Sequence, residues 1–323
     1  MTTLPTIVAD IGGTNTRVAL AWNGQVKSET IRRFGNAEHP DIGGVLRTYL
    51  AEAGVSGCAS ACVAVAGPVE AGTARLTNLD WTITEDEVGD STRAKRVAVI
   101  NDMQAQGHAL AHLAPASLRP VVPARQTNGR SRTVRLVVGV GTGFNAAPVH
   151  ETPTGILVAA SECGHASMPV RSDADLSLMR FVERTHGFAD VEDVLSGRGL
   201  EAVFAWQARE AGRDGRREAA KIMAAITDGG DAVAEAAGRT FVRLLGTVVG
   251  DLALTYLPFA GVYLIGGVAR AFTPHLEHFG FAEAMHDKGR FSDFAREFPV
   301  FVVEDDYAAL TGCARYLRAT ADA

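Results

Sequence analysis

The sequence predicts an α/β protein in which one pattern of strands and helices occurs twice. Strand-forming runs alternate with helical segments, which argues for a largely covered sheet with at least one parallel crossover. A strand followed by a Gly-Thr turn occurs at residues 7–15 and again at residues 136–145, with 128 positions between Thr14 and Thr142. At 323 residues, the chain is long enough for two domains that each bury a core.

The first half begins with three expected strands, at residues 6–10, 17–22 and 26–33, and Asn23-Gly24 is a hairpin signal between the last two. The remaining elements expected in this half are a helix at 41–53, strands at 59–66 and 96–100, and a helix from 101 to about 113. This alternation is the α/β pattern in its first copy.

The second half follows a proline-rich and basic connector at residues 115–132, which marks a domain boundary. Strands are expected at 133–140, 144–150 and 155–160, and later at 262–265 and 300–303, before a closing helix from 307 to about 318. The longest predicted helix, 231–257, carries an apolar stripe typical of a core or subunit-interface face. The stripe consists of Val233, Ala237, Phe241, Leu244, Val248, Leu252 and Tyr256.

The composition favours a small-molecule ligand over a nucleic acid or a membrane. Hydrophobic residues make up 47% of the chain and charged residues 21%, and the net charge of −6 provides no broad basic surface. The four cysteines lack metal-ligand spacing, and they are too few for a disulfide framework, so we expect reduced thiols in the cytoplasm. We find no secretory signal, and the uncharged stretch 252–269 is broken by Pro258 and glycines.

The two Gly-Thr turns are candidate phosphate loops. Glycines allow the backbone to approach an anion closely, and successive N–H groups form a concave nest for phosphate oxygens. Either turn alone is more often a simple hairpin connection. Two related loops, at Gly12-Gly13-Thr14 and Gly141-Thr142-Gly143, would grip one polyphosphate from opposite sides.

Asp10 ends the first strand and immediately precedes the first glycine turn. Magnesium prefers oxygen ligands and usually binds one or two carboxylates together with substrate phosphates. Asp10 is therefore the candidate carboxylate for binding Mg²⁺, either directly or through a bound water. The alternative is a turn-capping aspartate bonded to the N–H of Gly12 or Gly13.

Asn101 and Asp102 lie where an apolar strand meets a helix. Open α/β sheets bind ligands outside the carboxyl ends of their strands, so a carboxylate at this position can face a substrate and accept a hydroxyl proton. The amide of Asn101 would then fix a neighbouring hydroxyl. The alternative reading is a helix N-cap.

Three further segments carry polar or small residues after predicted strands or before a turn. Residues 161–165 combine Glu162, Cys163 and His165, which suits recognition of vicinal hydroxyls; zinc binding and a cysteine nucleophile are the alternatives. Glu192 is expected at the start of a short helical segment, where a solvated carboxylate is the alternative. Gly266-Gly267 would admit a flat nucleotide base against the backbone, or form a structural turn.

Together these segments resemble the bacterial hexokinase-type glucokinase family, within the superfamily of sugar kinases and actin. The resemblance extends from Ile7 to about Leu317. Its elements, in order, are residues 9–15, 77–81, 100–102, 139–143, 162–165, 194–197 and 266–267.

The resemblance implies two actin-like (ribonuclease H-like) α/β domains, each a mixed sheet with flanking helices, around a central cleft. It implies a domain formed by residues 1–112 and 304–323, completed by the closing helix, and a larger domain at 113–303. It also implies a cytoplasmic homodimer that transfers phosphate from ATP with Mg²⁺ to the 6-hydroxyl of glucose, at the entry to glycolysis.

The resemblance assigns roles residue by residue. Asp102 is similar to the family's catalytic base, and the sugar-hydroxyl partners are Asn101, Asp102, Glu162, His165 and Glu192. The residues implied in ATP and phosphate binding are Ala9, Asp10, Ile11, Gly12, Gly13, Thr14, Gly141, Thr142, Gly143, Gly266 and Gly267.

The chain departs from the family pattern at three positions. Asn145 stands where family members usually carry glycine, and Ser161 and Cys163 stand where glycines are common. Added side chains would narrow the pocket beside the second phosphate loop or the pocket beside residues 161–165, which we call the sugar loop. A kinase for another hexose and a weakly active hexose sensor are therefore the alternatives to a glucokinase.

Overall fold

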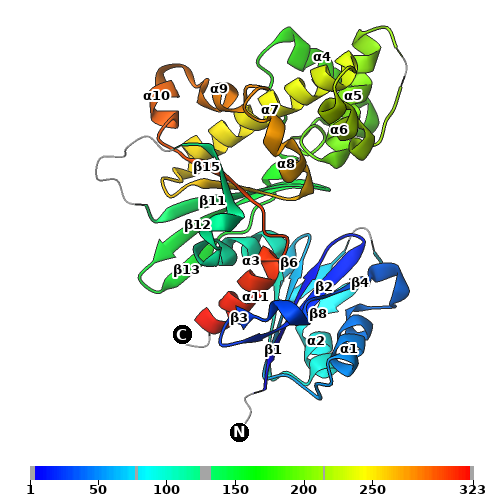
Figure 1. Cartoon of the computed structure of the whole chain (residues 1–323), viewed down its shortest axis with the longest axis vertical. Coiled ribbons are helices and arrows are strands. Elements are labelled where there is room, and N and C mark those ends of the chain that lie inside the picture. The colour runs from blue at the N-terminus through cyan, green and yellow to red at the C-terminus, as the bar shows by residue number, and fades with distance from the viewer. Residues whose placement is uncertain (1–3, 77–78, 124–131, 214, 321–323) are drawn as a thin grey trace. The chain divides into compact units, whose positions relative to one another are not determined.

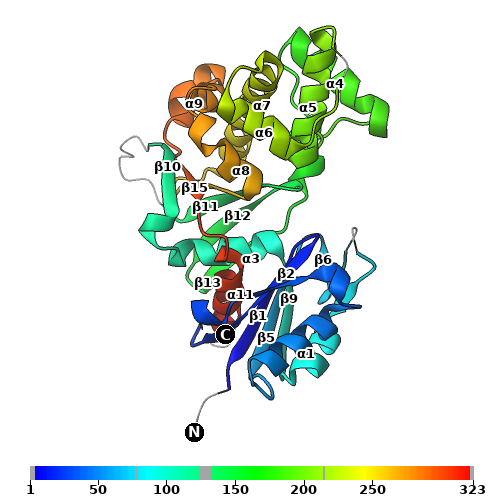
Figure 2. The same cartoon turned by 45° about the vertical axis from the view of Figure 1, so that its right-hand side comes forward.

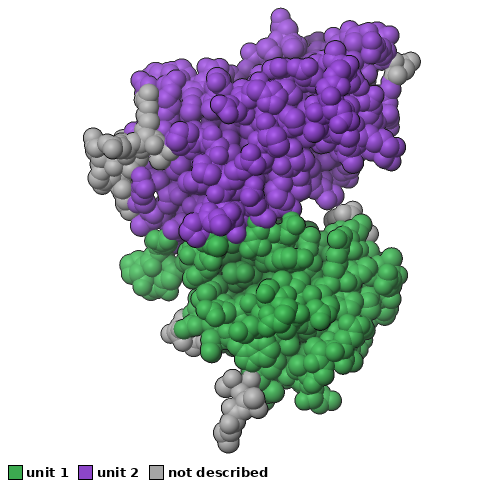
Figure 3. Space-filling model, viewed as in Figure 1, with its two compact units in different colours: residues 1–114, 151–160, 305–323 green, residues 115–150, 161–304 purple. Residues whose placement is uncertain are grey.

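The computed structural model describes residues 4–76, 79–123, 132–213 and 215–320. These residues form two compact units, shown in different colours in Figure 3. Unit 1 comprises Met1–Ala114, Glu151–Ala160 and Asp305–Ala323, and unit 2 comprises Pro115–His150 and Ser161–Glu304. Within the described residues, no helix combines the length and apolarity needed to cross a membrane.

Unit 1 contains a mixed six-stranded sheet in the order β3-β2-β1-β5-β9, with β4 also paired to β2 (Figures 1 and 2). Strands β1, β5 and β9 are parallel, whereas β2 runs antiparallel to β1. The bounds are β1 Thr6–Ile11, β2 Asn15–Trp22, β3 Gln25–Val26, β4 Arg32–Gly35, β5 Ser60–Val65 and β9 Arg96–Asn101. A small second sheet contains β6 Val69–Glu70, β7 Thr73–Arg75 and β8 Thr82–Thr84.

Helices cover both faces of the six-stranded sheet, because alternate residues of its strands are apolar on each side. Ile7, Ala9 and Ile11 pack in one core with residues of α1 (Ile42–Glu52) and α2 (Glu85–Thr92). Val8 packs in a second core with residues of α3 (Asp102–Ala109) and α11 (Ala308–Ala319). The C-terminal helix α11 thus belongs to the unit formed mainly by the N-terminal part of the chain. The 3₁₀ turns of this unit are η1 Ser28–Thr30, η2 Asn36–Glu38 and η3 Leu110–His112.

The second large sheet has the order β10-β15-β14-β11-β12-β13. Strands β11, β14 and β15 are parallel, and β10 and β12 pair antiparallel to β15 and β11. The bounds are β10 Leu118–Val122, β11 Val134–Val140, β12 Phe144–Thr152, β13 Gly155–Val158, β14 Val262–Ile265 and β15 Val300–Val303.

The core of unit 2 lies between this sheet and a layer of helices. The apolar stripe on α7 is buried in that core, since Ala237, Phe241 and Leu244 are at most 1% exposed. The helices are α4 Asp173–His186, α5 Gly197–Glu210, α6 Ala219–Asp228, α7 Ala232–Tyr256, α8 Gly267–Phe272, α9 Phe281–His286 and α10 Ser292–Ala295. The 3₁₀ turns are η4 Pro115–Ser117, η5 Cys163–His165, η6 Thr273–His275 and η7 Gly289–Phe291.

Some sequence-based predictions of local structure were wrong. The strand expected at residues 26–33 is interrupted by η1, in which Thr30 Oγ1 donates to the Lys27 carbonyl, and the strand resumes only at Arg32. Glu192, expected at the start of a helical segment, lies in a turn, and the following helix begins at Gly197. Helix α2 and strands β6, β7, β8 and β10 were not predicted.

Candidate active site

The first glycine turn connects β1 to β2 in unit 1. Gly12 N donates to the Asn15 carbonyl at 3.0 Å, and Gly13 and Thr14 are exposed. Asn36 anchors this turn: its Nδ2 donates to the Gly12 carbonyl at 2.8 Å, and its backbone N donates to the Thr14 carbonyl at 3.0 Å. Asn36 is 1% exposed, so the turn has a buried support. Asn36 carries no local signal of this role in the sequence, because 22 positions separate it from Thr14.

Asp10 is largely buried beside this turn and pairs with Arg17. The distance from Arg17 Nη1 to Asp10 Oδ2 is 3.1 Å, and the Asp10 side chain is 14% exposed. Burial raises the pKa of Asp10 above its ordinary value, although Arg17 opposes that shift. The N–H of Gly12 is bonded to Asn15 instead, so it does not support the turn-capping alternative for Asp10. Neighbouring Ala9 and Ile11 are buried in the core, so only their backbone groups are available to a ligand.

Asn101 and Asp102 follow β9, at the edge where β1 and β5 also end, because Ile11 aligns with Val65 and Val65 with Asn101. Asn101 is the N-cap of α3: its Oδ1 accepts from Met103 N at 2.9 Å, and its backbone N donates to the Gln104 side chain. This bears out the N-cap alternative for Asn101.

The two residues have further contacts at this edge. Asn101 Nδ2 donates to the Gly67 carbonyl at 2.9 Å. Asp102 is half-buried in the first turn of α3, where its Oδ1 accepts from Met103 N at 2.8 Å. Unit 1 therefore brings Asp10, the first glycine turn and Asp102 to one sheet edge.

The second glycine turn connects β11 to β12 in unit 2. Gly141 N donates to the Gly143 carbonyl, and the Gly141 carbonyl accepts from Gly197 N at the start of α5 at 2.8 Å. Gly266 lies at the same edge, because Ile265 aligns with Gly139 on the neighbouring strand. Its φ is +100°, and a Cβ there would lie 2.4 Å from the Val140 carbonyl oxygen. Gly266 is therefore required by the local geometry.

The predicted sugar loop pairs with the segment that contains Glu192. Glu192 N donates to the Gly164 carbonyl at 2.9 Å, and Val191 N donates to the Ala166 carbonyl at 3.0 Å. Glu162 precedes η5 and is exposed, as is His165. The pairing brings Glu162, His165 and Glu192 to the edge that carries the second glycine turn.

Two charged partners in this cluster were not identified from the sequence. Asp190 Oδ2 lies 2.9 Å from His165 Nδ1, and this hydrogen bond raises the pKa of His165. Arg198 Nη2 lies 3.2 Å from Glu192 Oε1, while Glu192 Oε2 accepts from Phe144 N at 2.9 Å. The Glu192 carboxylate thus connects the sugar loop to the end of the second glycine turn.

The three residues that depart from the family pattern contact one another. Asn145 Nδ2 donates to the Ser161 carbonyl at 2.5 Å, Cys163 N donates to Ser161 Oγ at 3.1 Å, and Cys163 Sγ lies 3.6 Å from Asn145 Oδ1. Burial raises the pKa of the Cys163 thiol, which makes it a poor nucleophile. Among the described side chains, no group of three His, Cys, Asp or Glu residues is placed to hold a metal ion, so zinc has no support here.

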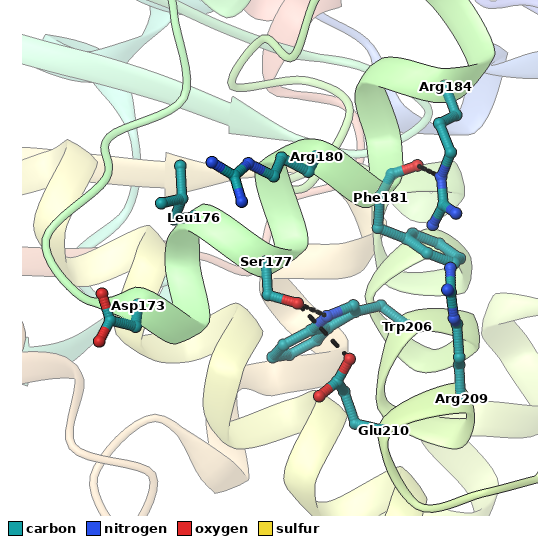
Figure 4. Close-up of a pocket in the computed structure, with 9 residues that line it drawn as sticks. All are labelled: Asp173, Leu176, Ser177, Arg180, Phe181, Arg184, Trp206, Arg209 and Glu210. Atoms are coloured by element: carbon teal, nitrogen blue, oxygen red, sulfur yellow. Dashed lines mark hydrogen bonds between the residues drawn. The ribbon is translucent and has the colours of Figure 1, made fainter.

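A surface cavity of about 560 Å³ lies elsewhere on unit 2, between α4 and α5 (Figure 4). Phe181 and Trp206 line it together with Arg180, Arg184 and Arg209, and Trp206 Nε1 donates to Ser177 Oγ at 3.2 Å. This cavity shares no residue with the predicted site. Each unit therefore carries its own polar cluster of candidate site residues at one sheet edge.

Comparisons with known proteins identify the family of this chain. The glucokinase family model matches residues 7–320. The glucokinase of Caulobacter sp. (strain K31) is 32% identical over 313 residues, which cover 95% of this chain and 93% of that protein. The glucokinase of Pseudomonas aeruginosa (strain LESB58) is 32% identical over 321 residues, covering 98% and 96%.

The structure has the same fold as a solved glucokinase from an Antarctic psychrotroph, with a TM-score of 0.84 and 31% identity, covering 97% of this chain and 98% of that one. The actin-like α/β class expected from the sequence is confirmed by this likeness. The chain therefore belongs to the glucokinase family, a family of ATP-dependent hexose phosphotransferases.

Proposed function

We propose that the chain transfers the γ-phosphoryl group of ATP to the 6-hydroxyl of D-glucose and acts at the entry to glycolysis in the cytoplasm. The observation that carries this proposal is the position of Asp102 at the carboxyl end of β9, on the same sheet edge as the first glycine turn. A half-buried carboxylate held at the start of a helix suits a base that accepts the proton of an attacking hydroxyl.

The two glycine turns would bind the ATP phosphates through backbone N–H groups, with the exposed hydroxyls of Thr14 and Thr142 beside them. Asp10 suits Mg²⁺, because that ion needs only one or two carboxylates when phosphate oxygens and water complete its shell. Arg17 contacts Oδ2 of Asp10, so Oδ1 is the oxygen that would hold the ion, directly or through water. The ion would supply neutralisation of charge on the transferred phosphoryl group.

Glu162, His165 and Glu192 would position the sugar through hydrogen bonds to its hydroxyl groups. Carboxylates accept from vicinal hydroxyls, and the exposed imidazole of His165 adds a third polar contact. Asn101 already caps α3 through Oδ1 and donates to the Gly67 carbonyl through Nδ2. A sugar hydroxyl would use the hydrogen-bonding capacity that remains on these two side-chain atoms.

Asp102→Asn tests the assignment of the base. We expect turnover to fall on the order of 10²-fold or more, with a much smaller change in glucose affinity, because the amide keeps the shape but accepts no proton. Asp86→Asn is a matched control, since Asp86 is an exposed residue in the first turn of another eight-residue helix of unit 1. Near-normal turnover of Asp102→Asn would remove Asp102 from this role.

The contacts among Asn145, Ser161 and Cys163 keep two alternatives open, a kinase for another hexose and a weakly active hexose sensor. ADP release measured with glucose, mannose, fructose, N-acetylglucosamine and no sugar separates them. Glucose-dependent release supports the proposal; release with another sugar alone, or sugar binding without turnover, contradicts it.

We also propose a homodimer, on the basis of the family. The apolar stripe of α7 does not support it, because that stripe lies in the core of unit 2. Light scattering coupled to size-exclusion chromatography should give twice the chain mass of 34.1 kDa.

A further inference from the structure

A pair of short segments in unit 2 fixes the surroundings of His165. Met168 N donates to the Ala189 carbonyl and Val191 N donates to the Ala166 carbonyl, each at 3.0 Å. Ser167 and Asp190 form an isolated antiparallel β-bridge, which lies between these two hydrogen bonds. The backbone therefore holds Asp190 beside the sugar loop, although 25 positions separate it from His165.

The Asp190 carboxylate is itself held in place. Its Oδ2 lies 2.9 Å from His165 Nδ1, and its Oδ1 accepts from Asp193 N at 2.8 Å. The Asp190 side chain is 15% exposed, whereas that of His165 is 61% exposed. The imidazole is thus anchored on its Nδ1 side while the ring is open to a ligand.

This geometry selects one form of the imidazole. An ionised carboxylate only accepts hydrogen bonds, so His165 Nδ1 must carry the proton that it shares with Asp190. In the neutral ring, Nε2 is then an acceptor. A sugar hydroxyl is a donor that this nitrogen can accept.

We propose that Asp190 is a positioning residue, which fixes the ring orientation and tautomer of His165 so that Nε2 accepts a hydrogen bond from a hydroxyl of the sugar substrate. This inference rests on the proposed function, since the sugar is the ligand of that function. An ion pair with one highly exposed partner contributes little to stability, so its expected effect is on binding.

The charges around His165 give the inference a pH signature. Asp190, Glu192 and Glu162 all act to raise the pKa of His165, and the hydrogen bond that His165 donates to Asp190 is the largest cause. Protonation of Nε2 removes the acceptor, so sugar binding should weaken as pH falls through this raised pKa. Without the Asp190 charge, the weakening should move to lower pH.

The experiment measures glucose binding by calorimetry without ATP, between about pH 5.5 and 8.5. Asp190→Asn should weaken binding roughly tenfold at the upper end of this range and shift the acid limb downward. In a His165→Gln background, Asp190→Asn should cause no further loss, because Asp190 acts through His165. Asp173→Asn, an exposed carboxylate in the first turn of α4, should leave binding unchanged.

Two-bond ¹H–¹⁵N spectra of the imidazoles, assigned with His165→Gln, report which nitrogen of His165 carries the proton. This measurement does not depend on catalytic activity. The native protein should show His165 protonated at Nδ1, and Asp190→Asn should mix the two tautomers. Additive losses in the double variant, or an unchanged tautomer in Asp190→Asn, would overturn the inference. Absence of glucose binding by the native protein would instead refute the sugar assignment, while the spectra still decide whether Asp190 fixes the ring.

Discussion

At the scale of single residues, Glu192 has two tasks that a variant series can separate. Its carboxylate accepts from Phe144 N and pairs with Arg198, and we also assign it to the sugar. Glu192→Gln keeps an oxygen for Phe144 N but loses the charge, so we expect weaker glucose binding with little change in stability. Glu192→Ala leaves Phe144 N–H without its acceptor and should also lower the free energy of unfolding by about 1–2 kcal/mol.

Urea unfolding and glucose titration of both variants check this prediction. Equal stability losses in Glu192→Gln and Glu192→Ala would show that the charge, and with it the Arg198 pair, provides the structural contribution. Unchanged glucose binding in both variants would remove Glu192 from the sugar site.

At the scale of elements, the packing of α11 on α3 depends on a glycine. A Cβ at Gly312 would lie 1.7 Å from the Ala105 carbonyl oxygen, which is backbone and cannot rotate away. Replacing glycine by alanine inside a helix ordinarily stabilises it by up to about 1 kcal/mol. Here we expect Gly312→Ala to destabilise unit 1 by about 3 kcal/mol or to prevent its folding, because the helices must separate.

Gly44→Ala provides the matched comparison in α1, where the added Cβ would make only ordinary contacts of 3.4 Å or more. It should be neutral or slightly stabilising in urea unfolding. A Gly312→Ala variant as stable as Gly44→Ala would show that the close approach of α3 and α11 is not required.

The elements also show what the sequence could predict. Strands β14 and β15 were predicted with their observed bounds, because each is a short continuous run of apolar residues. Helix α2 was missed because it buries only Val88 and Thr92, although its N-cap Thr84 and acidic first turn were available as signals. Strand β10 was missed because its pairing to β15 spans distant parts of the chain and includes Pro120.

The residues of the candidate site also divide into those that the sequence could predict and those that it could not. The glycine turns, Asp102 and the residues 162–165 carry local signals in strand ends and residue type. Asn36, Asp190 and Arg198 act through partners that only folding brings near, and no local pattern distinguishes them from surface residues. Whether the assigned residues bind ATP and sugar stays a prediction.

At the scale of the whole molecule, His108 links acid stability to the discontinuous unit 1. It lies in α3, is 7% exposed, and its ring meets Tyr316 of α11 edge-on at 5.2 Å. Burial lowers its pKa from 6.5 to about 4, so the unfolded chain binds the proton more readily than the folded protein. The contribution of uncharged His108 to the free energy of unfolding is therefore fully present above about pH 6.5, and it is lost as the pH falls toward 4.

His108→Phe should remove this dependence, because phenylalanine keeps a ring against Tyr316 and does not titrate. The difference in unfolding free energy between the native protein and the variant at pH 7 reports on packing alone. Between pH 7 and pH 4.5, the native protein should lose up to about 3 kcal/mol of unfolding free energy relative to the variant. Urea unfolding at both pH values measures it, and in a Trp206→Phe background the fluorescence of Trp22 and Trp81 follows unit 1 alone. A difference that does not change with pH would mean that His108 is not held neutral between α3 and α11.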